Sequence, residues 1–189
     1  MKNKCAFDID GVVADISNRI CQVVNQYTDL NWCPESITNY FYVDILRTKG
    51  VSENAINKIH FDCFVGDNLL KLEPEEGAIN VLSQFDDLVF ITAREKSFEG
   101  VTRQWLDRYF DSSYQLYFSG CDGWNADKSK ILKDLGINMF VEDSPTNIEY
   151  LIRGGITPII YHQHWNKDFH PKEALRVYSW ESIKKIIDF

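Results

Sequence analysis

The sequence has no long apolar run, no cluster of basic residues and no closely spaced cysteine pair, and each absence excludes a class of protein. No segment reaches about 18 consecutive apolar residues, so no membrane-spanning helix is expected. The formal net charge of -8, with no run of Lys or Arg, argues against a nucleic acid polymer or an anionic membrane as a partner. The 5 cysteines form no CxxC pair, which favours reduced thiols in a cytoplasmic protein.

The N-terminal segment also lacks the core of a signal peptide. In MKNKCAFDIDGVV the apolar residues are interrupted by Asp8 and Asp10, whereas a signal peptide needs an unbroken apolar stretch. Internal repeats and low-complexity tracts are absent as well. The 189 residues, 44% of them hydrophobic, suffice for one well-filled core with a modest insertion. We therefore expect a soluble globular protein in the cytoplasm.

What the sequence does contain is an alternation of short apolar runs and amphipathic segments of helical length. This pattern is typical of an α/β protein with a mostly parallel sheet and helices on both faces. Strands are predicted at residues 5–9, 88–92, 114–118, 138–142 and 157–162, and helices at 77–85, 98–110, 127–135, 145–153 and 180–188.

The segment between the first two predicted strands is too long for an ordinary crossover. Apolar residues recur at helical spacing from Ile16 to Tyr27, and residues 51–64 are a second helix candidate. Asp15 is expected to cap the first of these helices. We interpret residues 16–76 as a small helical cap, inserted into a core made of residues 1–15 and 77–189.

The stretch FDIDGVVADI places two carboxylates, Asp8 and Asp10, on the same side of a predicted strand. At about 4 Å and an effective dielectric constant of about 20, their charges repel by roughly 4 kcal/mol. One interpretation is a ligand site at the carboxyl end of the strand, where open parallel sheets bind ligands. The other is a hairpin, with Asp10 and Gly11 as its turn and both acids in water.

Other predicted strands end in complementary groups. The strand at 88–92 ends in Thr92, whose hydroxyl can donate to a phosphate oxygen, and the strand at 138–142 ends in Glu142, followed by Asp143. Four carboxylates at one edge of a sheet require a cation. Oxygen ligands without His or Cys favour a hard ion, and Mg²⁺ fits best because it tolerates a few carboxylates together with a phosphate.

A lysine stands at an unusual position in NADKSKILKDLGI. Lys128 falls in the first turn of a helix capped by Asn125 or Asp127, where the helix dipole disfavours a cation. Reaching the acids and a bound phosphate would explain this position. The alternative is an exposed surface lysine.

These elements occur in a known order: DxDG (Asp8, Asp10, Gly11), then Thr92, Lys128 and the pair Glu142 and Asp143. The set resembles the four motifs of the haloacid dehalogenase (HAD) superfamily, which implies a Rossmann-like core with a helical cap after the first strand. The segments FDIDGVVAD, ITAR, VEDSPTN and YHQHWN resemble the 5'(3')-deoxyribonucleotidases and their bacterial and phage relatives. Two departures affect the surroundings of the metal: Glu142 replaces the first Asp of a pair, and Asn147 stands where other members carry a further Asp.

The resemblance implies hydrolysis of a phosphomonoester through an aspartyl-phosphate, with Mg²⁺ as cofactor. Asp8 would attack phosphorus. Asp10 would protonate the leaving oxygen and later accept a proton from water, while its backbone carbonyl binds Mg²⁺. Asp143 would be the third protein ligand of the metal.

The remaining implied roles concern the phosphate. Thr92 and Lys128 would hold the transferred group, and Glu142 would orient a metal-bound water or Lys128. Gly11 would let the chain turn sharply, so that the amide groups after Asp10 can donate to the phosphate.

Several residues allow two interpretations. Ala93 and Arg94 follow Thr92 and are candidate substrate-binding residues, of which Arg94 either contacts the phosphate or pairs with a core acid. Tyr40 and Phe41 either stack on a base or form the core of the cap. His162 and His164 resemble a metal pair, but they lack a third ligand at suitable spacing, which favours a surface loop.

The leading hypothesis is a cytoplasmic Mg²⁺-dependent phosphatase of nucleoside monophosphates, whose partner is a small phosphorylated substrate. One rival keeps the chemistry and changes the substrate to a sugar phosphate or another small phosphomonoester. A second rival is a non-catalytic HAD-like module that binds a phosphorylated ligand. The intact pair Asp8 and Asp10 argues against this module, because an idle site has no need to hold four acids together.

Overall fold

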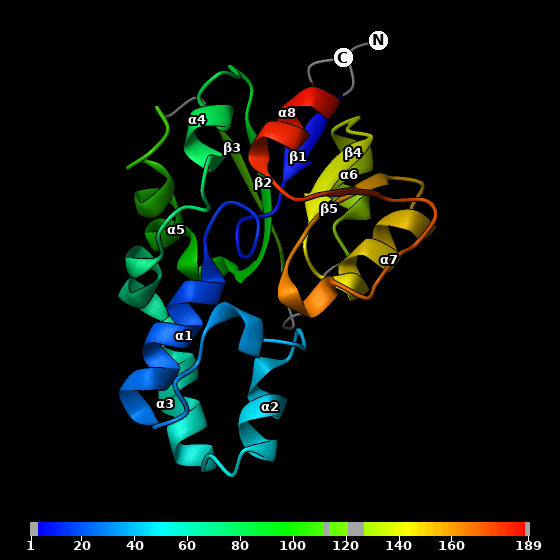
Figure 1. Cartoon of the computed structure of the whole chain (residues 1–189). Helices are drawn as coiled ribbons and strands as arrows, with labels where there is room; N and C mark the ends of the chain where they lie inside the picture. The colour runs from blue at the N-terminus through cyan, green and yellow to red at the C-terminus, as the bar shows by residue number, and fades with distance from the viewer. Residues whose placement is uncertain (1–3, 112–113, 121–126, 188–189) are drawn as a thin grey trace.

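The computed structural model describes residues 4–111, 114–120 and 127–187. Within these residues six strands form one sheet in the order β3-β2-β1-β4-β5-β6, and every neighbouring pair is parallel (Figure 1). The strands are β1 (Cys5–Phe7), β2 (Val89–Glu95), β3 (Gln115–Gly120), β4 (Met139–Glu142), β5 (Thr157–Tyr161) and β6 (Leu175–Val177). The predicted α/β class and parallel sheet are confirmed. The short edge strand β6 was not predicted.

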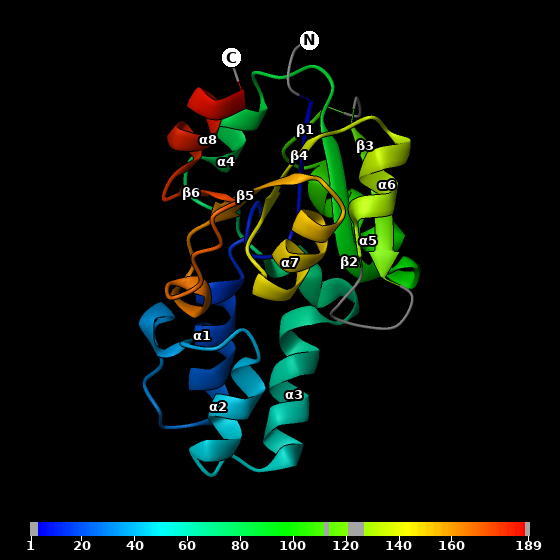
Figure 2. The same ribbon diagram turned by 90° about the vertical axis from the view of Figure 1, so that its right-hand side faces the viewer.

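Helices cover both faces of the sheet because side chains alternate along each strand. Phe7 and Phe90 point to the face covered by α4 (Ala78–Leu82), α5 (Glu99–Leu106) and α8 (Trp180–Ile187). Ala6 and Phe140 point to the opposite face, covered by α6 (Ser129–Asp134) and α7 (Pro145–Arg153). Figure 2 shows α4 and α8 on one side of the sheet and α6 and α7 on the other. This arrangement follows from right-handed crossovers that run outward in both directions from β1.

Residues 16–76 supply a group of helices beyond the carboxyl ends of the strands (Figure 1). They are α1 (Ile16–Tyr27), α2 (Tyr42–Thr48) and α3 (Glu53–Phe64), with short 3-10 helices η1 (Pro34–Ser36) and η2 (Gly66–Lys71). The apolar side chains of α1, α2 and α3 form a cluster separate from those of the sheet, joined by Trp165 from the loop after β5, which supports the proposed cap. Near the end of the insertion, Leu69 and Leu72 pack in the core between the sheet and α4, α5 and α8. Asp15 caps α1 as expected, accepting from the Asn18 amide at 2.9 Å.

The two chain segments that join the helical insertion to the sheet lie side by side. The amide of Asp15 donates to the carbonyl of Glu73 at 2.8 Å, and the amide of Glu75 donates to the carbonyl of Val13 at 2.8 Å. A β-bridge pairs Ala14 with Pro74. The insertion is therefore attached through one short pair of antiparallel segments next to the end of β1.

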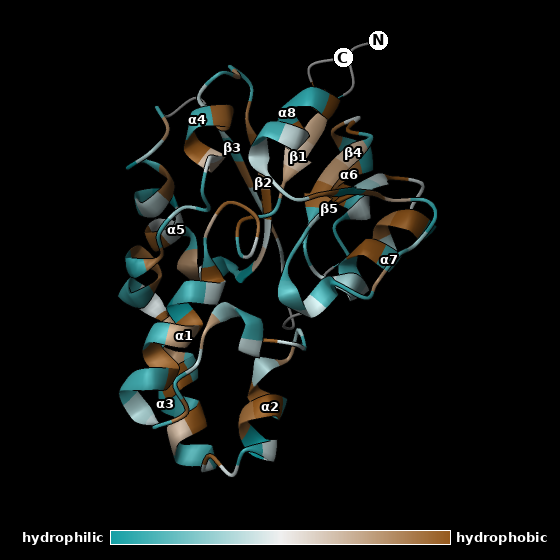
Figure 3. Ribbon diagram, viewed as in Figure 1, coloured by the Kyte–Doolittle hydropathy of each residue, from teal (hydrophilic) through white to brown (hydrophobic). Residues whose placement is uncertain are grey.

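Apolar residues gather where the layers meet. Figure 3 shows the central strands mainly in brown, whereas the outer surfaces of α5, α7 and α8 carry much teal. The remaining 3-10 helices are η3 (Lys96–Phe98) and η4 (His164–Asn166). Among the described residues, no helix combines the length and the hydropathy needed to cross a membrane.

Candidate active site

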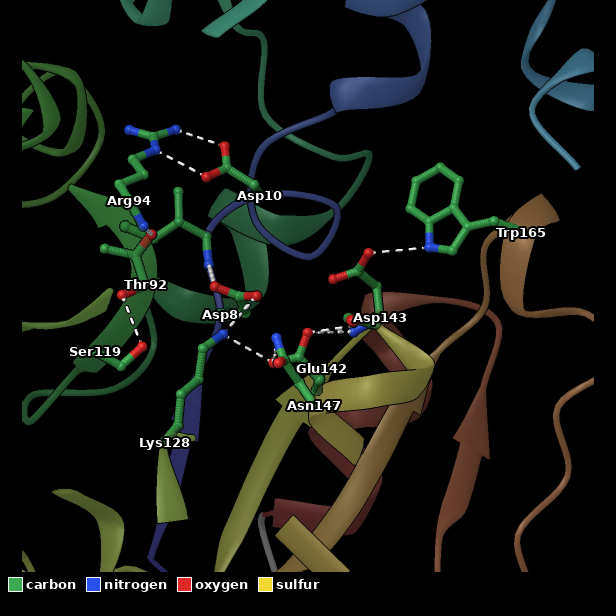
Figure 4. Close-up of polar contacts among 12 residues, drawn as sticks. Asp8, Asp10, Thr92, Arg94, Ser119, Lys128, Glu142, Asp143, Asn147 and Trp165 are labelled. Atoms are coloured by element: carbon green, nitrogen blue, oxygen red, sulfur yellow. Dashed lines mark hydrogen bonds and ion pairs between the residues drawn. The ribbon is translucent and has the colours of Figure 1, made fainter. Parts of the chain in front are cut away.

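Three adjacent strands bring Thr92 and the acidic residues together. Asp8 follows β1, Thr92 lies in β2, and Glu142 ends β4, directly before Asp143. Because β1 lies between β2 and β4, their carboxyl ends meet at one edge, the topological switch point of the sheet. Figure 4 shows these side chains converging. The hairpin interpretation of Asp10 and Gly11 is wrong, since β1 pairs in parallel with β2 and β4.

Lys128 lies between two of the acids. Its Nζ is 2.7 Å from Oδ2 of Asp8 and 2.8 Å from Oε2 of Glu142, and the residue is 1% exposed. The interpretation of Lys128 as an exposed lysine is therefore wrong. Burial lowers the pKa of Lys128, but the two carboxylates outweigh burial and hold the pKa above its ordinary value. The ammonium is charged at neutral pH.

The start of α6 differs slightly from the prediction. The helix begins at Ser129, with Lys128 at the N-cap position. Oδ1 of Asp127, the residue before the N-cap, accepts from the Ser129 amide at 2.8 Å, so Asp127 closes a turn at the helix start and is not the predicted N-cap. Asn125, the other candidate, lies outside the described residues.

Glu142 is surrounded by donors. Its Oε1 accepts from the amides of Asp143 at 3.1 Å and Ser144 at 3.0 Å, and its Oε2 accepts from Lys128 and, at 3.4 Å, from Nδ2 of Asn147. Burial raises the pKa of Glu142, but Lys128 and these donors outweigh it and leave the pKa lowered. Because both oxygens of Glu142 accept hydrogen bonds, its carboxylate is held in place and can orient Lys128. This supports one of the two roles that the resemblance implies for Glu142.

The cluster has a deficit of positive charge. Asp8, Glu142 and Asp143 are 6%, 0% and 1% exposed. Lys128 pairs with Asp8 and Glu142, and Asp143 has no ion pair among the described residues. Burial, and next the charge of Glu142, raise the pKa of both Asp8 and Asp143 well above the ordinary value. Three carboxylates and one ammonium leave a formal charge of about -2, which a divalent cation would neutralise.

The residues present fit such a cation. Asp8, Glu142 and Asp143 each offer a carboxylate oxygen, and these oxygens lie within 4.8 Å of one another. The donors are all oxygen, the set that Mg²⁺ prefers. Beside them, Oδ1 of Asn147 is buried and has no hydrogen-bond partner among the described residues. Because Glu142 is already saturated with donors, Asp8 and Asp143 are the side chains best able to hold the ion.

Arg94 pairs with a core acid, which was one of its two predicted roles. Its Nε and Nη2 donate to the two oxygens of Asp10 at 2.8 and 2.7 Å. Thr92 is fully buried beside Asp8, and its Oγ1 accepts from the Arg94 amide at 3.1 Å (Figure 4). An accepting hydroxyl keeps its own hydrogen for another partner, so Thr92 can still donate to a phosphate.

Gly11 occupies a position that only glycine fits. Its φ is +78°, and a Cβ built there would lie 2.6 Å from Oδ2 of Asp143. Its amide donates to the carbonyl of Ala14 at 2.9 Å, and the amides of the residues from Val12 to Ala14 donate to the carbonyl of Ile9. The expectation that the amides after Asp10 bind phosphate is therefore wrong for residues 11–14, because the turn itself uses them. Gly11 instead makes room for Asp143.

A cavity of about 170 Å³ opens between the sheet edge and the helical insertion. Asp8, Asp10, Ala93 and Arg94 line it from the sheet, and Tyr40, Tyr42, His60, Phe64 and Ile37 line it from the insertion. The predicted contact residue Tyr40 thus lies at the cavity. Phe41 does not line the cavity. It is 39% exposed and packs edge-on against Tyr40, with ring centroids 5.4 Å apart.

The loop after β5 is more buried than the sequence predicts. His162 and His164 were expected in a surface loop, but Gln163, Trp165 and Asn166 between and after them are buried. His162 contacts Arg176, and His164 lies near Glu35, so the two histidines are not arranged as a metal pair. The segment YHQHWN resembles the corresponding segment of the nucleotidases, but this resemblance does not indicate which of its residues face the site.

Comparisons with known proteins agree with this geometry. The chain matches the family described as "5' nucleotidase, deoxy (Pyrimidine), cytosolic type C protein" over residues 3–189. A nucleotidase of Clostridium acetobutylicum is 23% identical over 181 residues, covering 96% of this chain and 91% of that protein. This match spans both the sheet and the helical insertion.

Solved structures share the fold. A HAD-superfamily hydrolase of Geobacter sulfurreducens superposes with a TM-score of 0.62 at 18% identity, covering 98% of this chain and 96% of that one. A HAD family hydrolase of Deinococcus radiodurans, with bound phosphate and sodium, has a TM-score of 0.64 at 15% identity and covers 96% of this chain and 93% of that one. The predicted HAD-like architecture is confirmed.

Proposed function

The chain belongs to the family of cytosolic type C deoxy-5'-nucleotidases and is a phosphoric monoester hydrolase, and we propose that it hydrolyses nucleoside monophosphates in the cytoplasm with Mg²⁺ as cofactor. The observation that carries this proposal is the buried cluster of three carboxylates and one ammonium, whose member Asp8 lines a cavity with aromatic walls. The cluster suits a phosphate and a cation, and the cavity suits the rest of a nucleotide.

The proposed reaction starts at Asp8. Its Oδ1 accepts from the Ile9 amide at 2.7 Å and its Oδ2 pairs with Lys128, so the carboxylate is fixed in place. One of its oxygens attacks phosphorus, the ester bond to the leaving oxygen breaks, and an aspartyl-phosphate forms. Asp8 and Asp143 would hold the divalent cation, which when bound would neutralise charge on the phosphate oxygens and favour the ionised form of Asp8.

Asp10 is the proposed general acid and general base. In its protonated form Asp10 gives its proton to the leaving oxygen, and the resulting carboxylate then takes a proton from the water that attacks the aspartyl-phosphate, which releases inorganic phosphate and restores Asp8. Asp10 lines the cavity and is held by Arg94. Thr92 and Lys128 lie on either side of Asp8, where they can bind the oxygens of the transferred group (Figure 4).

The cavity walls favour a nucleotide over a sugar phosphate. The insertion contributes aromatic rings, those of Tyr40, Tyr42, His60 and Phe64. A planar base gains about 1–3 kcal/mol when it stacks on an aromatic side chain, whereas a sugar needs several polar partners. A nucleoside monophosphate places a charged group and a flat ring at opposite ends of one molecule, which matches both parts of the site.

Phosphate release from a panel of ribo- and deoxyribonucleotides, sugar phosphates and an aryl phosphate tests this function. We expect Mg²⁺-dependent release that is fastest with nucleotides and is abolished by Asp8→Asn. Faster turnover of a sugar phosphate would establish the rival substrate class. Equal activity of the wild type and Asp8→Asn would rule out the proposed nucleophile, and inactivity on every compound would favour the binding module.

A further inference from the structure

The loop after β5 holds the side chain and the main chain of Asp143. The indole Nε1 of Trp165 donates to Oδ2 of Asp143 over 3.1 Å, and Nδ2 of Asn166 donates to the backbone carbonyl of Asp143 over 2.8 Å. Trp165 is 8% exposed and Asn166 is fully buried. Figure 4 shows Trp165 facing Asp143 from outside the group of acids. The proposed reaction uses neither of these two side chains.

This loop is itself anchored to the sheet edge. Asn166 Nδ2 also donates to the carbonyl of Tyr161, at the end of β5, over 2.9 Å. Arg176, in β6, donates to Oδ1 and to the backbone carbonyl of Asn166, both at 2.9 Å. Because two strands fix Asn166, the adjacent Trp165 presents its N–H to Asp143 from a defined position.

The other side of Trp165 belongs to the helical insertion. Its ring packs in the apolar cluster of that insertion, with Ile20 and Ile37 among the members. Its ring centroid lies 6.4 Å from that of Tyr40, with the planes at 68°. Trp165 also lines the cavity. One side chain thus contacts the insertion, the cavity and a proposed cation ligand.

We propose that Trp165 is a positioning residue, which holds Oδ2 of Asp143 so that Oδ1 remains for the divalent cation and which ties that orientation to the packing of the helical insertion. The proposal rests on the proposed function, in which Asp143 binds Mg²⁺. An indole N–H donates and never accepts, so it satisfies one carboxylate oxygen without competing for the cation. Hydrogen-bond partners of metal ligands typically account for about 10–100-fold in metal affinity.

Calorimetric titration of the phosphate-free protein with Mg²⁺ tests the proposal without any substrate. We expect Trp165→Phe, which keeps an aromatic ring and removes the N–H, to weaken Mg²⁺ binding by about tenfold. Trp105→Phe is the matched control. Trp105 is fully buried and donates its indole N–H to the carbonyl of Leu72 at 2.7 Å, away from Asp143, and its loss should leave Mg²⁺ affinity within about twofold of the wild type.

A kinetic measurement separates positioning from general damage. If Trp165 acts through Asp143, the variant Trp165→Phe loses activity because less of the enzyme has Mg²⁺ bound. Excess Mg²⁺ then restores most of its kcat. If Trp165→Phe does not fold, β-(3-benzothienyl)alanine at position 165 keeps the shape of the indole and removes only the donor. Unchanged Mg²⁺ affinity in the folded variant overturns the proposal.

The two proposals can fail separately. If the wild type binds Mg²⁺, Trp165→Phe binds it more weakly and no phosphomonoester is hydrolysed, the proposed function falls and the role of Trp165 stands. If nucleotides are hydrolysed and Trp165→Phe matches the wild type in Mg²⁺ affinity, the role of Trp165 falls alone. A wild type that binds no divalent cation overturns both.

Discussion

Arg94 donates two parallel hydrogen bonds to Asp10, from Nε at 2.8 Å and from Nη2 at 2.7 Å. The remaining Nη1 donates to Oγ1 of Thr102 at 3.2 Å, so the guanidinium is itself held in place. A two-point pair of this kind fixes the orientation of a carboxyl group. Asp10, the proposed proton carrier, is therefore restrained on the side away from Lys128.

We predict that Arg94→Gln lowers kcat by at least about tenfold, because general acid and base catalysis contributes about 10²–10⁴-fold and depends on the position of the carrier. Steady-state kinetics on the best substrate at saturating Mg²⁺ measures the effect. Arg103→Gln is the control: Arg103 pairs with Glu99 at the surface, where such pairs contribute little. A kcat for Arg94→Gln within twofold of the wild type would show that Asp10 needs no such restraint.

Lys128 is predicted to be essential for stability as well as for activity. Lys128→Met leaves Asp8 and Glu142 buried without their cation, and removal of one partner from a buried ion pair typically costs about 3–5 kcal/mol. The unpaired carboxylates would then bind protons more tightly in the folded state, so the loss should grow as pH rises from 5 to 8. Urea unfolding of Lys128→Met and of Lys130→Met, at an exposed neighbouring position, measures the difference. Similar stability of the two variants would contradict the prediction.

Two glycines with the same backbone conformation allow a matched test of the space beside Asp143. Gly11 has a φ of +78° and Gly50 a φ of +79°, but only at Gly11 does an added Cβ meet Asp143, at 2.6 Å, whereas nothing lies within 4 Å at Gly50. Gly50→Ala should cost about 1 kcal/mol of backbone strain and leave activity intact. Gly11→Ala should cost the same strain and also displace the carboxylate, with loss of Mg²⁺ affinity. Equal affinity in both variants would argue against this steric role.

The sequence predicts the α/β class and the parallel sheet, and it also indicates which polar residues lie together at the edge of that sheet. Thr92, Lys128 and Glu142 could be anticipated because each stands at the end of an apolar strand or the start of a helix, where geometry leaves few alternatives. Residues 42–48 (α2) and 175–177 (β6) were missed, since neither segment is long enough for its periodicity to be seen.

Contacts between distant segments could not be derived from spacing. Trp165 meets Asp143, and Gln163 meets Gly11, only because β5 lies next to β4. The prediction of phosphate-binding amides at residues 11–14 failed for a related reason. In a tight turn the backbone amides donate to carbonyls of the same turn. Whether they do so depends on ψ angles that the sequence does not specify.

Glu75 lies at the junction between the insertion and the sheet, and it should make stability depend on pH. Its Oε1 accepts from Nε2 of Gln163 at 2.8 Å, and burial, followed by the charge of Asp15, raises its pKa from 4.5 to about 7. Because the folded state then binds a proton more tightly than the unfolded state, this group stabilises the fold least above pH 7 and progressively more as pH falls towards 4.5.

Glu75→Gln removes the ionisation and keeps an oxygen that can accept from Gln163. We therefore expect its Tm to match the wild type at pH 5 and to exceed it by several degrees at pH 8, where the wild type must keep a partly buried charge. Titrations elsewhere in the protein cancel in this difference because they occur in both proteins. Glu76→Gln, at the exposed next position, should shift Tm by a similar small amount at both pH values. A Tm difference for Glu75→Gln that is independent of pH would mean that Glu75 does not titrate in this range, and that its side chain contributes to the junction only through its hydrogen bond.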